Sequence, residues 1–234
     1  MKKLLFTIIA LTFFAGCATL PGPVEEQYLV DKTDKDAALI ENIETKIIAK
    51  NKEKQSAEQN RKENTPDIEN TREELNLLSR ENKLLKDQLE LYTKSRDARN
   101  IEIKKEQLAE NNLKIEKQKK LLKFQEAQKI FFDASADLKT AELAVLVAQL
   151  DFEKSQIANA YREKKEPAEE TEKKGFFASL FQKDPEDRFG YKKYSTHLEK
   201  MNKDHETSLE KYNKAKNAYE AAKKNLDNTA VEAK

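Results

Sequence analysis

Glycine and proline are scarce in this chain, and their positions divide it into long uninterrupted stretches. The 234 residues include only four glycines and five prolines. These residues gather over 16–23, at Pro66 and over 167–190, and no strong helix breaker lies between those places. The spacing predicts helical pieces over 34–65, 66–165 and 191–234. An unbroken helix over 66–165 would be about 150 Å long at 1.5 Å per residue.

The composition favours exposed helices over a compact enzyme core. Charged residues make up 37% of the chain, aromatic residues 8%, and tryptophan is absent. The 44 basic residues nearly balance the 43 acidic ones, and interleaved charges along periodic apolar residues are typical of long helices and coiled coils. The balance argues against a nucleic-acid surface, which needs a basic face. We therefore expect an all-α protein, an elongated long-helix coiled coil with a C-terminal antiparallel hairpin.

The clearest heptad pattern lies in the first part of the middle piece. Its apolar stripe consists of Leu75, Leu78, Asn82, Leu85, Leu89 and Tyr92. A lone asparagine in such a stripe fixes register in parallel dimers, and a Glu81–Lys86 ion pair between chains would support one. Folding back about Pro66 would instead bring Ile40, Ile43 and Ile47 onto the same stripe. Both a possible homodimer and cover from within the chain therefore remain open.

The last piece is expected to pack antiparallel on residues 124–165. The apolar surface of 124–161 is wider than one stripe, so it must face more than one neighbour. Residues 191–226 place apolar or small side chains alternately three and four residues apart. Folding the chain about residue 177 predicts pairs between Leu150 and His205, Leu143 and Tyr212, and Phe131 and Leu226.

The connector over 166–190 carries an unusual aromatic cluster. Phe176, Phe177, Leu180 and Phe181 would share one face of a short helix. The cluster either folds onto the end of the hairpin or docks a partner. Acidic residues nearby disfavour a membrane, so an unidentified envelope protein is the favoured partner.

The N-terminal sequence MKKLLFTIIALTFFAGC has the layout of a secretory signal over residues 1–16. Its Ala15-Gly16-Cys17 ending resembles the lipobox of bacterial lipoproteins, although Phe14 stands where that motif usually has an aliphatic residue. An ordinary signal peptide with an incidental cysteine is the alternative. The resemblance implies cleavage between Gly16 and Cys17, lipidation of Cys17 and a membrane anchor, with 17–33 as an extended tether. By the same resemblance, Ala18 in place of Asp implies the bacterial outer membrane, with the protein facing the periplasm.

No catalytic motif is visible in the sequence. It has no glycine-rich phosphate loop, no nucleophile elbow and no Cys/His metal spacing, and His197, Met201 and His205 are better interpreted as seam residues than as metal ligands. We expect no catalytic residues, metal, cofactor, small-molecule substrate or nucleic-acid partner. The predicted function is that of a non-catalytic envelope tether, spacer or scaffold. The alternative is a periplasmic hairpin component of an export or efflux assembly.

Overall fold

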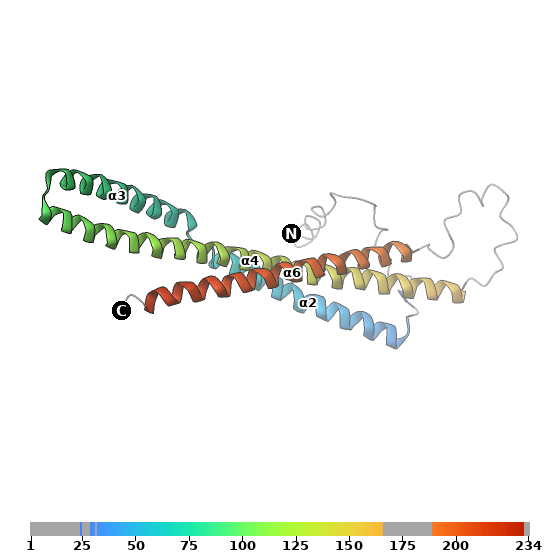
Figure 1. Ribbon diagram of the computed structural model, residues 1–234. Helices are drawn as coiled ribbons and strands as arrows, with labels where there is room; N and C mark the ends of the chain where they lie inside the picture. The colour runs from blue at the N-terminus through green and yellow to red at the C-terminus, as the bar shows by residue number, and fades with distance from the viewer. Residues whose placement is uncertain (1–23, 25–28, 31, 166–188, 232–234) are drawn as a thin grey trace, which may run out of the picture. The chain divides into compact units, whose positions relative to one another are not determined.

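The computed structural model describes residues 24, 29–30, 32–165 and 189–231 (Figure 1). They form the helices α2 (Asp34–Glu63), α3 (Ile68–Ser95), α4 (Ala98–Lys165) and α6 (Tyr191–Val231), and these ranges contain no strand. The predicted all-α class is confirmed. None of the helices within these ranges is long and apolar enough to cross a membrane.

The single helix expected over 66–165 is wrong, because the chain turns at Arg96 and Asp97. Arg96 takes a left-handed conformation with φ of 60°. Its N–H donates to the Thr93 carbonyl (3.3 Å), and the Asp97 N–H donates to the Tyr92 carbonyl (3.1 Å). These two bonds form a Schellman motif, which ends a helix. The Asp97 side chain then accepts the Asn100 N–H (3.2 Å) and caps the start of α4.

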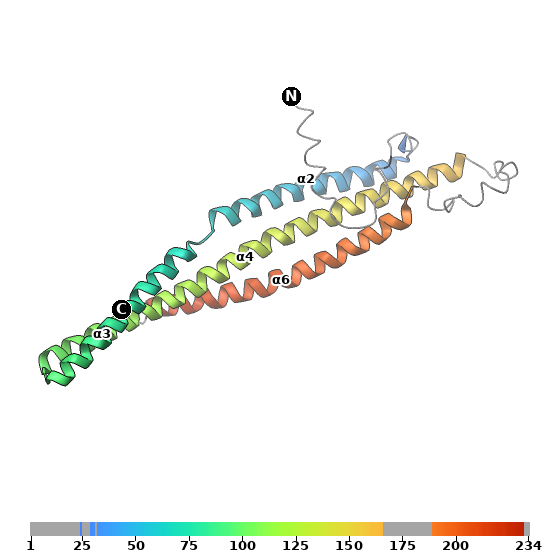
Figure 2. The same cartoon turned by 90° about the horizontal axis from the view of Figure 1, so that it is seen from above.

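The helices build two compact units, one of which contains residues 46–146 and 201–231. In this unit α3 runs back along the first part of α4, and the two views agree on that arrangement (Figures 1 and 2). Farther along, α4 lies between α2 and α6 (Figure 2). The apolar core of this unit contains Leu85, Ala134, Ala136, Leu138 and Ala215. The wide apolar surface of α4 therefore does face more than one neighbour.

The other unit takes the first part of α2, the last part of α4 and the first part of α6. Thr33 begins α2 with a capping box: its hydroxyl accepts the Asp36 N–H (3.2 Å), and its own N–H donates to the Asp36 carboxylate (3.1 Å). The core of this unit consists of Leu29, Ile40, Ile43, Ala148, Ser155, Ala158 and Tyr194. Leu29 lies within the extended tether expected over 17–33, but it is buried in this core.

The antiparallel pairing of α4 with α6 is confirmed, but its expected register is wrong. Phe131 contacts Tyr212 and Tyr219, with ring centroids 5.6 and 5.0 Å apart, whereas the sequence predicted Leu226 as its neighbour. In the other unit, Phe152 lies 5.1 Å from Tyr191. The expected register assumed that both helices extend equally far from the middle of the connector. Instead α6 begins at Tyr191, opposite Phe152, while α4 continues to Lys165.

Candidate functional site

The stripe of α3 is covered by α4 of the same chain. The Asn82 side-chain amide donates to the side-chain Oδ1 of Asn112, and the Asn111 side-chain amide donates to the backbone carbonyl of Leu78 (3.0 Å). Helix α4, and not the isoleucines of α2, therefore covers this stripe. Two more contacts join the same helices: Gln118 donates to Glu74 (2.8 Å), and Arg72 pairs with Glu126 (2.9 Å).

Buried carboxamides make the seam between α3 and α4 unusually polar. Asn82 and Asn111 are only 7% and 3% exposed. Five buried side-chain oxygens accept no hydrogen bond from the described residues; they belong to Asn82, Gln88, Asn111, Gln118 and Gln125. A buried polar atom without a partner costs about 1–3 kcal/mol. The seam is consequently held less firmly than an apolar seam of equal length.

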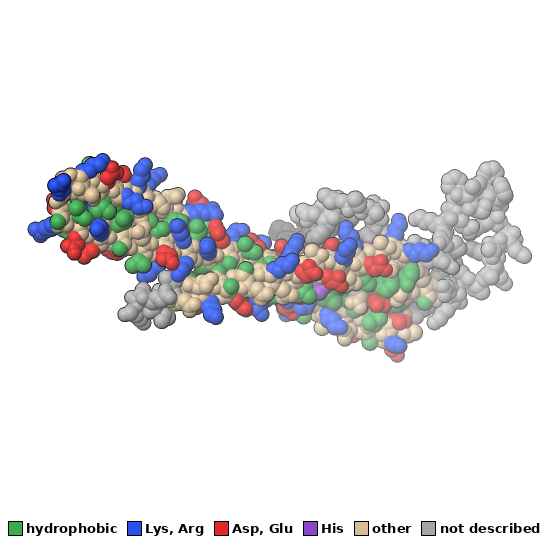
Figure 3. All heavy atoms as spheres, viewed as in Figure 1, with side chains coloured by type: hydrophobic (Ala, Val, Ile, Leu, Met, Phe, Trp, Pro, Cys, Tyr) green, Lys and Arg blue, Asp and Glu red, His purple; other side chains and the backbone are tan. Residues whose placement is uncertain are grey.

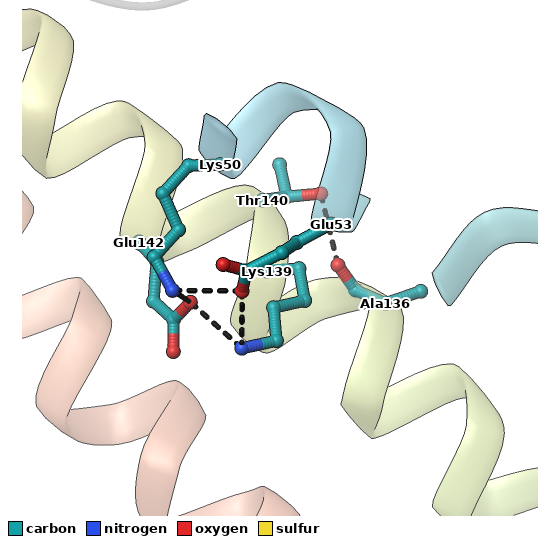
Figure 4. A network of polar contacts seen from close by, with 6 residues as sticks. All are labelled: Lys50, Glu53, Ala136, Lys139, Thr140 and Glu142. Carbon is teal, nitrogen blue, oxygen red and sulfur yellow. Dashed lines mark hydrogen bonds and ion pairs between the residues drawn. The ribbon is translucent and has the colours of Figure 1, made fainter. Parts of the chain in front are cut away.

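Four charged side chains link α2 to α4 in a closed ring (Figure 4). The Lys50 ammonium lies 2.8 Å from Glu53 and 3.0 Å from Glu142. The Lys139 ammonium lies 3.1 Å from the same Glu53 oxygen and 3.0 Å from the same Glu142 oxygen. Each lysine therefore bridges both carboxylates, and each carboxylate receives both lysines. A network of four charges holds its side chains in place more firmly than an isolated surface ion pair does.

The ring keeps its charges at neutral pH. Burial opposes ionisation of Glu142, but hydrogen bonds from Lys50 and Lys139 outweigh it and lower the pKa of this carboxyl. Burial also opposes the charge on Lys139, yet its bonds to Glu142 and Glu53 raise the pKa of the ammonium group. A general acid or base works best with a pKa near the operating pH. These shifts move away from neutrality, so the geometry favours a clamp between helices.

A second titratable cluster lies in the unit that contains Tyr194. Burial raises the pKa of Asp151, and the nearby charges of Lys154 and His197 oppose that rise only in part. Burial, followed by the charge of Asp151, raises the pKa of the Tyr194 phenol. Lys154 also pairs with Glu44 (3.1 Å) and so links α4 to α2. Burial therefore disfavours the charged form of Asp151 in the folded protein.

An open groove of about 480 Å³ lies between α4 and α6. Its lining residues are Ile130, Asp133, Ala134, Asp137, Ser208, Lys211, Lys214 and Ala215. Acidic side chains stand on the α4 wall and basic ones on the α6 wall, and Asp133 also pairs with Lys129 (2.9 Å). Ser208 is the only hydroxyl in the lining, and no histidine accompanies it. The lining therefore contains no Ser–His pair.

The sequence-predicted sites lie outside the described residues. These are Gly16 and Cys17 at the N-terminus and Phe176, Phe177, Leu180 and Phe181 in the connector. Of the seam residues, His197, Met201 and His205 are half-buried on α6. No group of three or more His, Cys, Asp and Glu side chains able to hold a metal ion occurs among the residues that the structure describes.

Sequence reasoning missed a second apolar row on α3. Leu77, Leu84 and Leu91 are 62%, 57% and 65% exposed, and they repeat every seven residues. Figure 3 shows hydrophobic side chains at the surface of the hairpin formed by α3 and the start of α4. The seven-residue spacing of these leucines is visible in the sequence. The stripe that contains Asn82 has more apolar residues, alternately three and four apart, and so was the stronger pattern.

Comparison with known proteins gives no relative: no family description, no curated protein and no solved structure matches this chain.

Proposed function

We propose that the protein is a non-catalytic, lipid-anchored lipoprotein of the bacterial envelope that acts as a tether, spacer or scaffold for a protein assembly. The observation that carries this proposal is the Ala15-Gly16-Cys17 ending of an apolar leader. Two or more acyl chains would anchor the chain durably, since each buried methylene contributes about 0.8 kcal/mol.

The long helices support a role in spacing or support. Helix α4 is continuous over 68 residues, which corresponds to about 100 Å of helix at 1.5 Å per residue. The polar clusters of the described residues join helices to one another, as the ring of Lys50, Glu53, Lys139 and Glu142 does. Side chains used in this way favour a structural role over a catalytic one.

The proposed address is the outer membrane, with the chain facing the periplasm. It rests on Ala18, which follows the cysteine where an aspartate would favour retention at the inner membrane. The proposed docking site for an envelope protein is the cluster of Phe176, Phe177, Leu180 and Phe181, whose four apolar side chains fit a partner of apolar character.

A hairpin component of an export or efflux assembly is the second candidate. The antiparallel packing of α4 and α6, seen in the contact of Phe131 with Tyr212, favours it. Adaptor subunits of this kind also carry β-rich domains, and the described residues contain no strand. The envelope scaffold is therefore the better-supported function.

Metabolic labelling with a fatty-acid analogue in a bacterial host tests the anchor. We expect the wild-type chain to take up label and Cys17→Ser to take up none. Phe14→Leu is the matched control, because it restores the usual aliphatic residue and should label at least as well. Equal labelling of Cys17→Ser and wild type would refute the lipoprotein assignment.

Membrane fractionation of Ala18→Asp tests the address separately. We expect this variant to remain labelled but to move from the outer-membrane to the inner-membrane fraction. If the distribution does not change while labelling persists, the anchor stands and the proposed address is wrong.

A further inference from the structure

The exposed leucines of α3 form a row on the side of the helix that faces away from α4. We call Leu77, Leu84 and Leu91 the outer row. At 100° per residue, Leu84 lies 200° around the helix from the buried Asn82. Among the described residues, α4 covers the stripe that contains Asn82 and Leu85, and the outer row stays exposed. Three solvent-exposed leucines at strict heptad spacing supply one of the two apolar positions per heptad that packed helices use.

Charged residues beside the outer row alternate in sign at the same spacing. They are Glu73, Arg80, Asp87 and Lys94, all exposed. Lys94 pairs with Glu90 on its own helix (2.6 Å), whereas Glu73, Arg80 and Asp87 have no ion-pair partner among the described residues. Along α3 these charges run negative, positive, negative, positive. A second copy of the helix running in the opposite direction would therefore place an opposite charge against each of them.

We propose that the outer row is the contact between two copies of this chain, packed antiparallel about a two-fold axis at Leu84. This arrangement places Leu84 against Leu84 of the second copy and Leu77 against its Leu91. It also places Glu73 against Lys94 and Arg80 against Asp87. In a parallel two-fold arrangement these four positions would lie on opposite sides of the leucine row in the two copies and would not meet. A contact related by a two-fold axis uses the same patch on both copies, as this one does.

The contact is small, so the dimer should depend on concentration. Specific interfaces of standard size bury about 1,200–2,000 Å², and a contact centred on three leucines per copy lies at the low end of the scale. Anchoring at a membrane, which rests on the proposed function, would raise the local concentration and favour the dimer.

Disulfide cross-linking of the full chain in a Cys17→Ser background tests the orientation. Leu84→Cys should cross-link to itself under mild oxidation, because the axis brings the two positions together. Leu77→Cys alone and Leu91→Cys alone should not, but a mixture of the two should. The matched control is Leu113→Cys on α4, which is equally exposed (60%) and lies off the row. Self-linking of Leu77→Cys and Leu91→Cys without linking of the mixture would overturn the antiparallel arrangement. Cross-linking of Leu113→Cys as strong as that of Leu84→Cys would overturn the site.

Charge reversal measured by sedimentation velocity tests the pairing independently. Arg80→Asp and Asp87→Arg should each weaken the dimer about tenfold, because each sets like charges together at two symmetric places. The double variant R80D/D87R should restore the affinity to within about threefold. Circular dichroism should show unchanged helicity, since both side chains are exposed. In the same Cys17→Ser background, single variants with the parent's affinity, a double variant that fails to recover, or a parent chain that is monomeric at every concentration would each overturn the proposal. The background lacks the lipidated cysteine, so these results are independent of the lipoprotein assignment.

Discussion

Replacing Phe131 by alanine should weaken the packing of α4 on α6 more than any neighbouring change on the exposed side of α4. The Phe131 ring stacks on Tyr219 at 5.0 Å and 10° and also contacts Tyr212 and Phe132 at 5.6 and 5.3 Å. Replacing a fully buried phenylalanine by alanine lowers the free energy of unfolding by about 3–5 kcal/mol. Phe131 is half-buried, so we expect a loss of about 2–4 kcal/mol, including about 0.5–1.5 kcal/mol for each aromatic contact.

Urea unfolding of the full chain, followed by far-ultraviolet circular dichroism, measures this loss. Ile130→Ala is the matched control, because Ile130 is the preceding residue and is 59% exposed. We expect it to cost less than about 1 kcal/mol. A loss in Phe131→Ala no greater than that in Ile130→Ala would refute the argument from aromatic packing.

A double-mutant cycle with the same assay tests the register. Phe131→Ala and Tyr219→Ala should show a coupling energy of about 0.5–1.5 kcal/mol, because the two rings touch. Phe131→Ala and Leu226→Ala should be additive within about 0.5 kcal/mol. Coupling to Leu226 in place of Tyr219 would restore the register that the sequence predicted.

Two further predictions concern stability. Asp151→Asn should raise the free energy of unfolding at pH 7, since burial raises the pKa of this carboxyl in the folded state and its ionisation then opposes folding. The gain should vanish below pH ~3.9, the ordinary value for aspartate, where both states hold the proton; urea unfolding at pH 3 and pH 7 checks this, and an equal gain at both values would contradict it. Arg96→Gly should stabilise the fold by about 0.5–1 kcal/mol in thermal melts, because glycine takes the left-handed conformation of Arg96 without steric cost. Lys105→Gly, at an exposed position inside α4, should destabilise by a similar amount, and a loss in both variants would contradict the argument.

The sequence predicted the helices well where glycine or proline separates them, and it failed where a polar residue does so. The turn at Arg96 needs one left-handed residue and one capping side chain, which Arg96 and Asp97 supply. Because arginine carries no turn signal of its own, the count of glycines and prolines gave no warning of it. The faltering of the heptad pattern after Tyr92 was the only visible sign.

Which helix packs against which was harder to predict than which face of each helix is apolar. Apolar periodicity identified the side of α3 that carries Leu85 and the side of α6 that carries Tyr212. It could not identify α4 as the partner of α3, because that choice depends on the turn at Arg96. The polar contact between Asn82 and Asn112 likewise exists only in this pairing, since residues 30 positions apart meet only after the chain reverses.

Helix α4 covers the stripe of α3 that contains Asn82 and Leu85, and this limits which face of α3 a dimer can use. In a parallel zipper, Asn82 would set the register and Glu81 would pair with Lys86 of the other chain. Asn82 instead joins α3 to α4 through Asn112, so Asn82 is not available to a second copy. The proposed self-association through α3 therefore uses the outer face, where Leu84 is exposed. In the proposed antiparallel arrangement, the alternating charges on that face lie against charges of opposite sign. The same helix thus carries one pattern that suggests a parallel dimer and another that favours an antiparallel one, and the intramolecular hairpin decides between them.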